Sequence, residues 1–152
     1  MADSYRKFSE EIGDITPEEA AWIQETLSMS CEGLEGDALK QWCDARGLEP
    51  DFHEDSLDVW PNFEWSLNNQ DHTFWFYAEE SFDEDHITEF LRMFLKKFRP
   101  KVVITITSAE TCSKPRIGEF GGLWFAISAK EILCGGTYRD ALEAAQVLFN
   151  DL

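Results

Sequence analysis

Basic residues are scarce in this 152-residue sequence, which has 13 Lys and Arg against 30 Asp and Glu and a net charge of −17. Residues 1–92 hold 24 acids and 5 bases, a net −19, whereas residues 93–152 hold 6 acids and 8 bases, a net +2. An acidic surface of this strength repels nucleic acid and anionic membranes and attracts basic surfaces. Direct binding to nucleic acid or to a membrane is therefore not expected, although acids can also serve only to keep an aromatic-rich protein in solution.

Export signals and metal-binding motifs are also missing. No apolar run is long enough to span a bilayer, and no apolar segment follows the start Met-Ala-Asp-Ser-Tyr-Arg-Lys, so neither a membrane helix nor a secretory signal is expected. The cysteines form no Cys-x-x-Cys pair and have no zinc-type Cys/His spacing. We predict a cytoplasmic protein with reduced thiols and with no metal or other cofactor. The cysteines are Cys31, Cys43, Cys112 and Cys134.

What the sequence does contain is material for a hydrophobic core. Apolar residues make up 43% of the chain and aromatic residues 14%, including 12 Phe and 6 Trp. This composition is too apolar for a disordered chain, and the length is usual for one domain. We predict a single domain over residues 1–152, with an exposed acidic connector over residues 48–61, where acidic and turn-forming residues are concentrated.

The first part of the chain predicts a strand and two helices. Residues 5–12 are consistent with a strand. Thr16 and Glu19 have the spacing of a capping box, with proline between them at the first helical position, so a helix is predicted from there to about residue 29. A second, shorter helix is predicted over residues 37–46, ended by a glycine.

The middle of the chain predicts a hairpin followed by an amphipathic helix. Residues 63–67 and 72–78 alternate between apolar and polar or between two aromatic faces, as paired strands do. Ser81 to Glu84 has the form of a capping box, and a helix over residues 83–98 follows it. Its apolar residues recur at helical spacing and should form one buried face. They are Ile87, Phe90, Leu91, Phe94, Leu95 and Phe98.

Two more strands, over residues 102–107 and 121–128, and a final helix from Thr137 complete the predicted order β-α-(α)-β-β-α-β-β-α. Residues 4–107 spell βαββαβ, which is the ferredoxin-like pattern. We therefore predict an α+β fold in which a ferredoxin-like sheet gains an added strand and a C-terminal helix, with the helices mainly on one face. The apolar residues of the final helix are Tyr138, Leu142, Ala145 and Leu148.

The segment from Ser108 to Phe120 is the most unusual part of the chain. A connection of that length between two strands is typical of a functional or mobile loop. Three interpretations stay open. The first is a peptide or anion contact made by its two bases and backbone amides, and the second is catalysis by its thiol or carboxylates. The third is a structural loop in which glycines shape the turn and the charged residues pair with each other or with the acidic half, for example by clamping the loop onto Glu79 or Glu110. The candidate contact residues are Glu110, Cys112, Lys114, Arg116 and Glu119.

Catalysis by Cys112 would require a base within hydrogen-bond reach. The only histidines are His53, His72 and His86, and each lies beside an acid in the sequence. Histidines in acidic surroundings are more often ordinary solvated side chains than catalytic bases. The residues therefore do not decide between an enzyme and a binding protein, but they favour the latter, and we assign no catalytic residue.

Acidic residues gather in clusters that should form exposed surface. If Glu79 and Glu80, at the end of a predicted strand, lay near Glu110 and Glu119, they could hold a divalent metal, although no Asp-x-Asp pattern supports such a site. The predicted acidic surface comprises Asp51, Glu54, Asp55, Asp58, Glu79, Glu80, Asp83, Glu84 and Asp85.

Several short motifs together carry a resemblance to a family. They are Phe-Tyr-Ala-Glu-Glu at 76–80, Phe-Leu-Lys-Lys-Phe-Arg-Pro at 94–100 and Glu-Thr-Cys-Ser-Lys-Pro-Arg-Ile-Gly-Glu-Phe-Gly-Gly at 110–122, and the helix start at 16–22 also fits. The segment 63–131 resembles a family of small proteins from bacteria, phages and mobile elements whose function is not established. The resemblance implies a small accessory protein, and it carries over no functional residue.

The function that these features favour is a small acidic interaction module. In the setting that the resemblance implies, such a protein could mimic the charge of nucleic acid and inhibit a host defence nuclease by occupying its basic groove. The expected partner is thus a protein with a basic surface, and self-association through a sheet edge or a Trp-rich surface is a further option. The alternative function is a small-ligand-binding protein or enzyme that uses strand-end carboxylates and the 108–120 segment.

Overall fold

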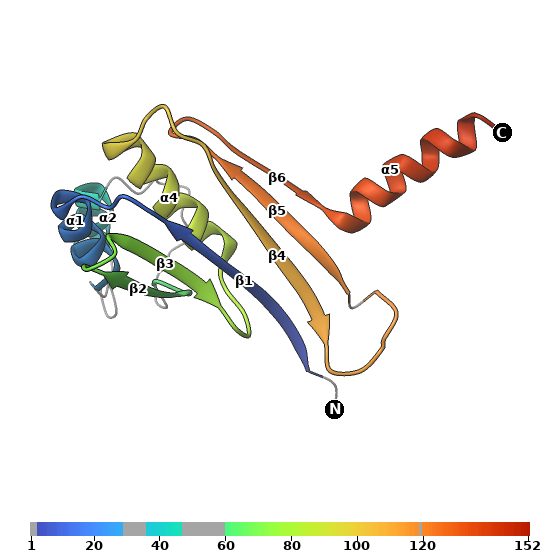
Figure 1. The fold of residues 1–152 in the computed structure, drawn as a ribbon, viewed down its shortest axis with the longest axis horizontal. Coiled ribbons are helices and arrows are strands. Elements are labelled where there is room, and N and C mark those ends of the chain that lie inside the picture. Colours follow the sequence, from blue (N-terminus) through green and yellow to red (C-terminus); the bar gives the residue numbers. More distant parts are fainter. Residues whose placement is uncertain (1–2, 29–35, 47–59, 119) are drawn as a thin grey trace.

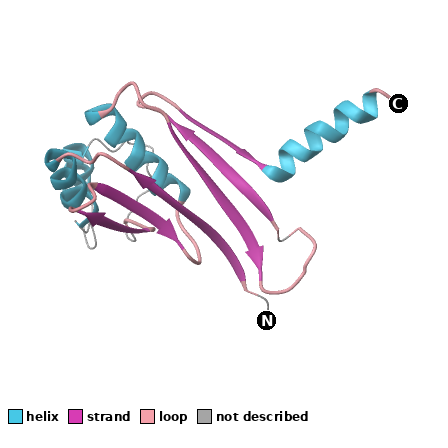
Figure 2. Cartoon of the chain, viewed as in Figure 1, coloured by secondary structure: helices cyan, strands magenta, loops and turns pink. Residues whose placement is uncertain are grey.

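The chain folds as an α+β structure, which confirms the predicted class. A computed structural model describes residues 3–28, 36–46, 60–118 and 120–152. Within these residues it contains one six-stranded antiparallel sheet and four helices (Figure 1; Figure 2). In chain order the elements are β1 (Ser4–Ile12), α1 (Pro17–Ser28), α2 (Gly36–Arg46), β2 (Glu64–Asn68), β3 (Thr73–Ala78), α4 (Glu84–Phe98), β4 (Ile104–Cys112), β5 (Gly121–Ile127), β6 (Ile132–Gly136) and α5 (Thr137–Asn150).

The strand order across the sheet is β2-β3-β1-β4-β5-β6, and β1 connects its two halves. The C-terminal part of β1 pairs with β3, with Phe8 opposite Ala78, whereas its N-terminal part pairs with β4, with Ser4 opposite Cys112. Where β4 is no longer paired with β1, the Glu10 side chain accepts a hydrogen bond from the Thr107 backbone N–H at 3.3 Å. A side chain thus satisfies a backbone donor that the sheet leaves open.

The core lies between one face of the sheet and α4. Ile87, Phe90, Leu91, Phe94 and Leu95 are all fully buried, so the predicted apolar face of this helix is confirmed at these five positions, while Phe98 is half-buried. The aromatic rings pack closely, because Trp22 of α1 stacks on Phe90 with ring centroids 5.5 Å apart. The sheet contributes alternate residues to this core, as a strand with one buried face must. These sheet residues are Phe8, Ile12, Phe74, Phe76, Ala78, Ile106, Phe125 and Ile127.

The helix starts show one capping prediction confirmed and one corrected. Glu19 donates its backbone N–H to the Thr16 hydroxyl at 3.1 Å and accepts the Thr16 N–H at 2.9 Å, which is the predicted reciprocal box. The second box is wrong, because Asp83 and not Ser81 caps α4: its carboxylate accepts the N–H of Asp85 at 2.9 Å. The helix begins two residues later than a Ser81 cap requires, since the side chain of Phe82 is buried in the core.

Strand β4 runs further than predicted and shortens the unusual segment. Ser108, Ala109 and Glu110 pair with residues of β5, from Leu123 back to Gly121, so residues 108–112 belong to the sheet. The polar composition of this stretch suggested a loop, but antiparallel pairing on both sides outweighs the weak strand preference of such residues. The connection between β4 and β5 is therefore residues 113–120, and Ser113 ties its start to Asp3 through two hydrogen bonds of 2.8 Å.

Strand β6 was not predicted at all. It is short and ends in Gly135 and Gly136, and glycines in such a run favour a turn interpretation. In the structure it pairs with β5 along its whole length, with Cys134 opposite Phe125. Cys134 is exposed on this edge strand.

Helix α5 forms where it was predicted, but it does not cover the sheet. It leaves the end of β6 and projects away from the rest of the chain (Figure 1), and none of its residues is buried. The expectation that the helices lie on a sheet face is therefore wrong for this helix, because periodicity shows which side of a helix is apolar but not what covers it.

Two further expectations about exposure need correction. Trp60 falls in the stretch predicted as an exposed connector, but its side chain is buried and its indole donates to the Thr26 carbonyl at 3.2 Å. His86 was interpreted as a solvated side chain, but it is fully buried beside Trp60, and its Nδ1 accepts the Asn62 N–H at 3.0 Å. Both residues are held in place by packing between segments distant in sequence, which local composition does not reveal.

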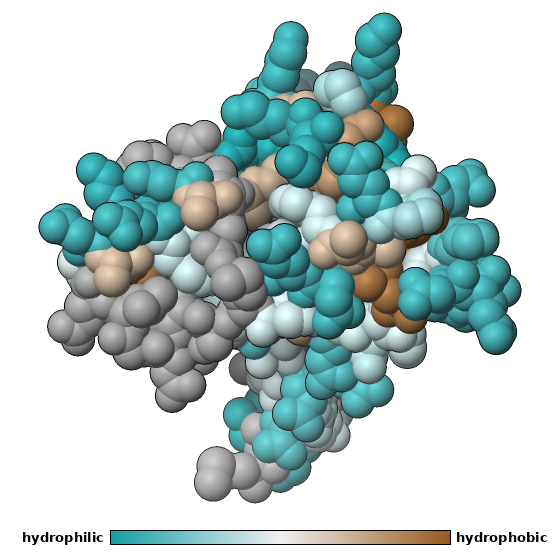
Figure 3. All heavy atoms as spheres, turned by 90° about the vertical axis from the view of Figure 1, so that its left-hand side faces the viewer, coloured by the Kyte–Doolittle hydropathy of each residue, from teal (hydrophilic) through white to brown (hydrophobic). Residues whose placement is uncertain are grey.

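The surface at the α1 and α2 end of the molecule is mainly hydrophilic among the described residues, with only small hydrophobic patches (Figure 3). No helix in the described part of the chain is long and apolar enough to cross a membrane.

Candidate functional site

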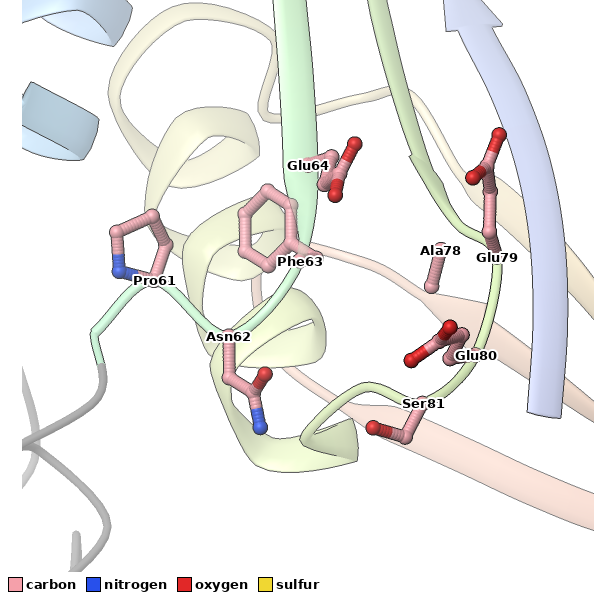
Figure 4. A pocket seen from close by; sticks show the side chains of 8 residues that line it. All are labelled: Pro61, Asn62, Phe63, Glu64, Ala78, Glu79, Glu80 and Ser81. Carbon is pink, nitrogen blue, oxygen red and sulfur yellow. The ribbon is translucent and has the colours of Figure 1, made fainter. Parts of the chain in front are cut away.

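Three carboxylates surround one cavity at an edge of the sheet. Because β2 and β3 are antiparallel, the first residue of β2, Glu64, lies opposite Tyr77 near the end of β3, and Glu79 and Glu80 follow that strand. Figure 4 shows these three carboxylates around the space between the two strand ends. We call this cavity, of about 480 Å³, the acidic cavity; its remaining lining residues are Pro61, Asn62, Phe63, Ala78 and Ser81.

The carboxylates of the acidic cavity are exposed, and no base in the described part of the chain pairs with them. Among the described residues, no ion pair involves Glu64, Glu79 or Glu80. The Tyr77 phenol is hydrogen-bonded to Glu64, which raises the pKa of that phenol, with a further contribution from the charge of Glu79. The cavity therefore carries a concentrated negative charge that a cationic group from outside can neutralise.

The neighbouring acids of the predicted acidic surface lie at the start of α4 and have structural roles there. Asp83 caps α4 and lies 3.6 Å from the buried His86 imidazole, and Glu84 is bonded to Arg6. Asp85 is exposed in the first turn of α4, where an acid is favoured by the helix dipole. The other predicted members, Asp51, Glu54, Asp55 and Asp58, lie outside the described residues.

Arg6, and not a base of the 108–120 segment, is the base that lies beside Glu110. Its guanidinium pairs with Glu84 and lies 3.6 Å from Glu110, and it also lies over the Phe82 ring at 5.1 Å. Lys114 and Arg116 are exposed, and neither takes part in an ion pair within the described part of the chain. Among the interpretations left open by the sequence, the one in which these two bases clamp their loop onto Glu110 or Glu79 is therefore wrong, because Arg6 of β1 lies beside Glu110.

Cys112 has no histidine beside it among the described residues. It pairs with Ser4 at the start of β1, whereas His72 accepts a hydrogen bond from Ile15, just past the other end of that strand. A nine-residue strand spans roughly 30 Å, which is far beyond hydrogen-bond reach. His86 is enclosed in the core next to Trp60, and His53 lies outside the described residues.

The structure also separates the carboxylates proposed for a metal. Glu79 and Glu80 line the acidic cavity, whereas Glu110 lines a different cavity, and Glu119 lies outside the described residues. Over the ranges that the structure describes, no group of three or more His, Cys, Asp or Glu is placed to hold a metal ion.

A second cavity was not predicted from the sequence, because it is formed partly by β6, which was not predicted. It is a hollow of about 750 Å³ on the face of β4, β5 and β6, closed at one side by the 113–120 connection and at another by the start of α5. We call it the C-terminal trough. Its apolar lining consists of Ile117, Phe120, Leu123, Phe125, Cys134 and Tyr138, together with several glycines.

Comparison of the chain with protein-family models, with curated proteins and with solved structures gives no match.

Proposed function

We propose that this protein is a non-enzymatic interaction module that binds a basic surface of a partner protein through its acidic cavity. The observation that supports this is the group of Glu64, Glu79 and Glu80: three carboxylates line one concave surface, with no base paired to them among the described residues. Such an arrangement raises the energy of the free protein by mutual repulsion, and a cationic partner relieves it.

A lysine or arginine side chain from the partner is the group that fits the acidic cavity. Charge-assisted hydrogen bonds between guanidinium and carboxylate are shorter and stronger than neutral ones, and two acids can share one guanidinium. The net charge of −19 over residues 1–92 adds a long-range attraction, which speeds encounter with a basic surface at low salt.

Within this proposal, the partner is a nucleic-acid-handling protein of a bacterial host, such as a defence nuclease, and the chain is an inhibitor from a phage or mobile element that occupies the basic groove by charge mimicry. The acidic half supports this choice, since a groove that binds phosphates binds carboxylates for the same electrostatic reason. We also propose that residues 4–112 follow the ferredoxin-like plan, which the order β4-β1-β3-β2, with helices after β1 and β3, supports.

The test is capture of partners from a bacterial lysate at low salt, followed by affinity measurement with the captured protein at increasing salt. We expect a basic, nucleic-acid-handling partner whose affinity falls steeply as salt rises. The variant Glu64→Gln/Glu79→Gln/Glu80→Gln should weaken binding at least tenfold. The matched control Glu25→Gln/Asp44→Asn/Glu143→Gln removes the same charge from exposed helix positions and should weaken it by less than about threefold.

Two results would count against the proposal. Capture of no basic partner at low salt contradicts the module as a whole. Equal weakening by the two triple variants would mean that only net charge matters and that the acidic cavity is not the binding site.

A further inference from the structure

Helix α5 carries an apolar stripe that no described part of the chain covers. Its apolar residues recur at the spacing of one helix face, and Leu142 is 53% exposed while Leu148 and Phe149 are each 69% exposed. A helix of 14 residues is marginal in water without tertiary packing. The stripe therefore needs a partner surface; it consists of Tyr138, Ala141, Leu142, Ala145, Leu148 and Phe149.

The same chain holds an uncovered apolar surface of matching kind. In the C-terminal trough, Ile117 is 102% exposed and Phe120 is 53% exposed, and the strands beneath contribute Leu123 with Gly121 and Gly136. Glycines and small side chains leave depth for bulky ones, and the stripe supplies bulky side chains separated by alanines. Contiguous exposed apolar patches on a protein of this size usually mark an interaction site.

We propose that the chain forms a two-fold symmetric dimer in which the apolar stripe of α5 from each copy docks in the C-terminal trough of the other copy. One contact of this kind covers the stripe of one copy and the trough of the other. The two-fold axis repeats this contact, so that both stripes and both troughs are covered. Pairing of two α5 helices with each other would leave both troughs open.

The contacts at the base of α5 leave Tyr138 at the border of the trough of its own chain and direct the rest of the stripe away from it. The Trp124 indole donates to Asp140 at 3.4 Å, and Arg139 donates to the Cys134 carbonyl at 2.9 Å. Thr137 lies so close to Gly122 that a side chain at that glycine would be 2.9 Å from its hydroxyl. These three contacts fix the first turn against β5 and β6, so the rest of the helix extends outward (Figure 1).

The charge distribution also favours self-association through the C-terminal part of the chain. Two copies repel each other through residues 1–92, which carry −19, whereas residues 93–152 carry +2 and can approach closely. The acids that line the trough, Glu84 and Glu110, lie beside Arg6, and the 113–120 connection that borders the trough carries the exposed bases Lys114 and Arg116. Helix α5 with Asp151 carries three acids against one base. A helix of net negative charge thus meets a loop of positive charge.

The area that this docking covers is enough for a stable dimer. Fourteen helical residues span about 21 Å, and a helix is about 10–12 Å wide. One face of such a helix removes roughly 400 Å² from water, with a similar area on the trough, so two contacts bury on the order of 1,600 Å². This is the standard size of a specific protein interface.

Sedimentation velocity of the full chain between 5 and 100 µM tests the proposal, with circular dichroism to check that each variant is folded. We expect the wild type to sediment as a dimer of a 17.5 kDa chain. Leu142→Glu places a charge in the stripe and should raise the dimer dissociation constant at least a hundredfold. Val147→Glu makes the same kind of change on the opposite side of the helix, at a residue that is 61% exposed, and should stay dimeric.

A trough variant separates the remaining arrangements. Ile117→Glu alters a fully exposed loop residue, so it cannot harm the fold through burial, and it should dissociate the dimer as Leu142→Glu does. A dimer that survives Ile117→Glu but not Leu142→Glu would mean that the two helices pair with each other, which overturns the proposal. A wild type that is monomeric at 100 µM, or a Val147→Glu variant that dissociates equally, would also overturn it.

Discussion

The guanidinium of Arg99 is hydrogen-bonded to both carboxylate oxygens of Glu19, at 2.8 and 3.1 Å. Glu19 lies in the first turn of α1 and is 3% exposed, and Arg99 directly follows α4. The same guanidinium donates to the carbonyls of Gly13 and Asp14 at 3.0 Å. One side chain therefore joins the chain after β1, the start of α1 and the end of α4.

Replacing Arg99 by Ala should destabilise the fold strongly. The change leaves the buried Glu19 carboxylate without its partner, and breaking a buried pair in this way typically costs about 3–5 kcal/mol. Urea unfolding should show a correspondingly lower free energy of unfolding. Lys96→Ala removes a charge from an exposed position in the last turn of α4 and should change that free energy by less than about 0.5 kcal/mol. Equal effects of the two variants would contradict a structural role for the Glu19–Arg99 pair.

The same pair predicts how stability depends on pH. Burial raises the pKa of the Glu19 carboxyl, but hydrogen bonds from Arg99 and Thr16 and the charge of Arg99 outweigh burial and hold this pKa below its ordinary value of 4.5. A carboxyl with a depressed pKa stabilises the fold above the unfolded-state pKa, and this stability is lost as the pH falls through the folded-state pKa.

The measurement is the difference in free energy of unfolding between wild type and Glu19→Gln from pH 7 to pH 3. The difference should be constant above about pH 5.5, about one unit above the ordinary pKa, and should shrink below pH 4.5. Glu25→Gln, at an exposed position of the same helix, serves as the control and should show no such change. A wild-type advantage that grows as the pH falls would reverse the sign of the argument.

Sequence patterns predicted the elements whose signals are local. The capping box at Thr16 and Glu19 and the apolar face around Phe94 depend on spacing within one helix, and both are confirmed. The pairing of Glu19 with Arg99 could not be predicted, because the two residues are 80 positions apart and each has an adequate local explanation. That Arg6, rather than Lys114 or Arg116, lies beside Glu110 could not be predicted either, because it depends on the pairing of β1 with β4.

The candidate sites were predicted only in part for a related reason. Glu79 and Glu80 were identified as strand-end carboxylates, but their grouping with Glu64 depends on the register of the β2–β3 hairpin. The C-terminal trough could not be predicted because β6 forms part of it, and the two glycines at the end of β6 favoured a turn over a strand. Strand pairing is a property of the assembled sheet, and local composition predicts it poorly where strands are short or glycine-rich.

Truncation of Phe94 should test the packing of α4 on the sheet. Phe94 is fully buried, and Phe→Ala changes in well-packed cores cost about 3–5 kcal/mol. Phe98, one turn later on the same helix, is only half-buried, so Phe98→Ala should cost clearly less. Thermal and urea unfolding should rank the two variants in this order, and a Phe94→Ala protein of nearly wild-type stability would mean that this face of the helix is not packed.

Removal of both loop bases should have little effect on stability. Lys114 and Arg116 are exposed and have no ion pair among the described residues, so Lys114→Ala/Arg116→Ala should change the free energy of unfolding by less than about 1 kcal/mol. Arg6→Ala should cost more, roughly 1–2 kcal/mol, because that side chain contacts two carboxylates and the Phe82 ring. A double variant that is less stable than Arg6→Ala would restore the clamp interpretation.

Gly135 is the glycine of β6 that the neighbouring strand constrains most. A Cβ atom at this position would lie 2.3 Å from the Trp124 indole, far inside van der Waals contact. Gly135→Ala should therefore push the indole off the strand and break its hydrogen bond to Asp140, at a cost of about 1–3 kcal/mol. The resonance of the Trp124 indole N–H should shift in a ¹⁵N-correlated NMR spectrum, and urea unfolding should report the lost stability.

Gly121→Ala is the control, because its Cβ would meet only the Glu110 carboxylate at 3.7 Å, which is ordinary contact. If both variants keep wild-type stability and the indole resonance does not move, then Trp124 does not pack over Gly135 and the first turn of α5 is not held in the way described above.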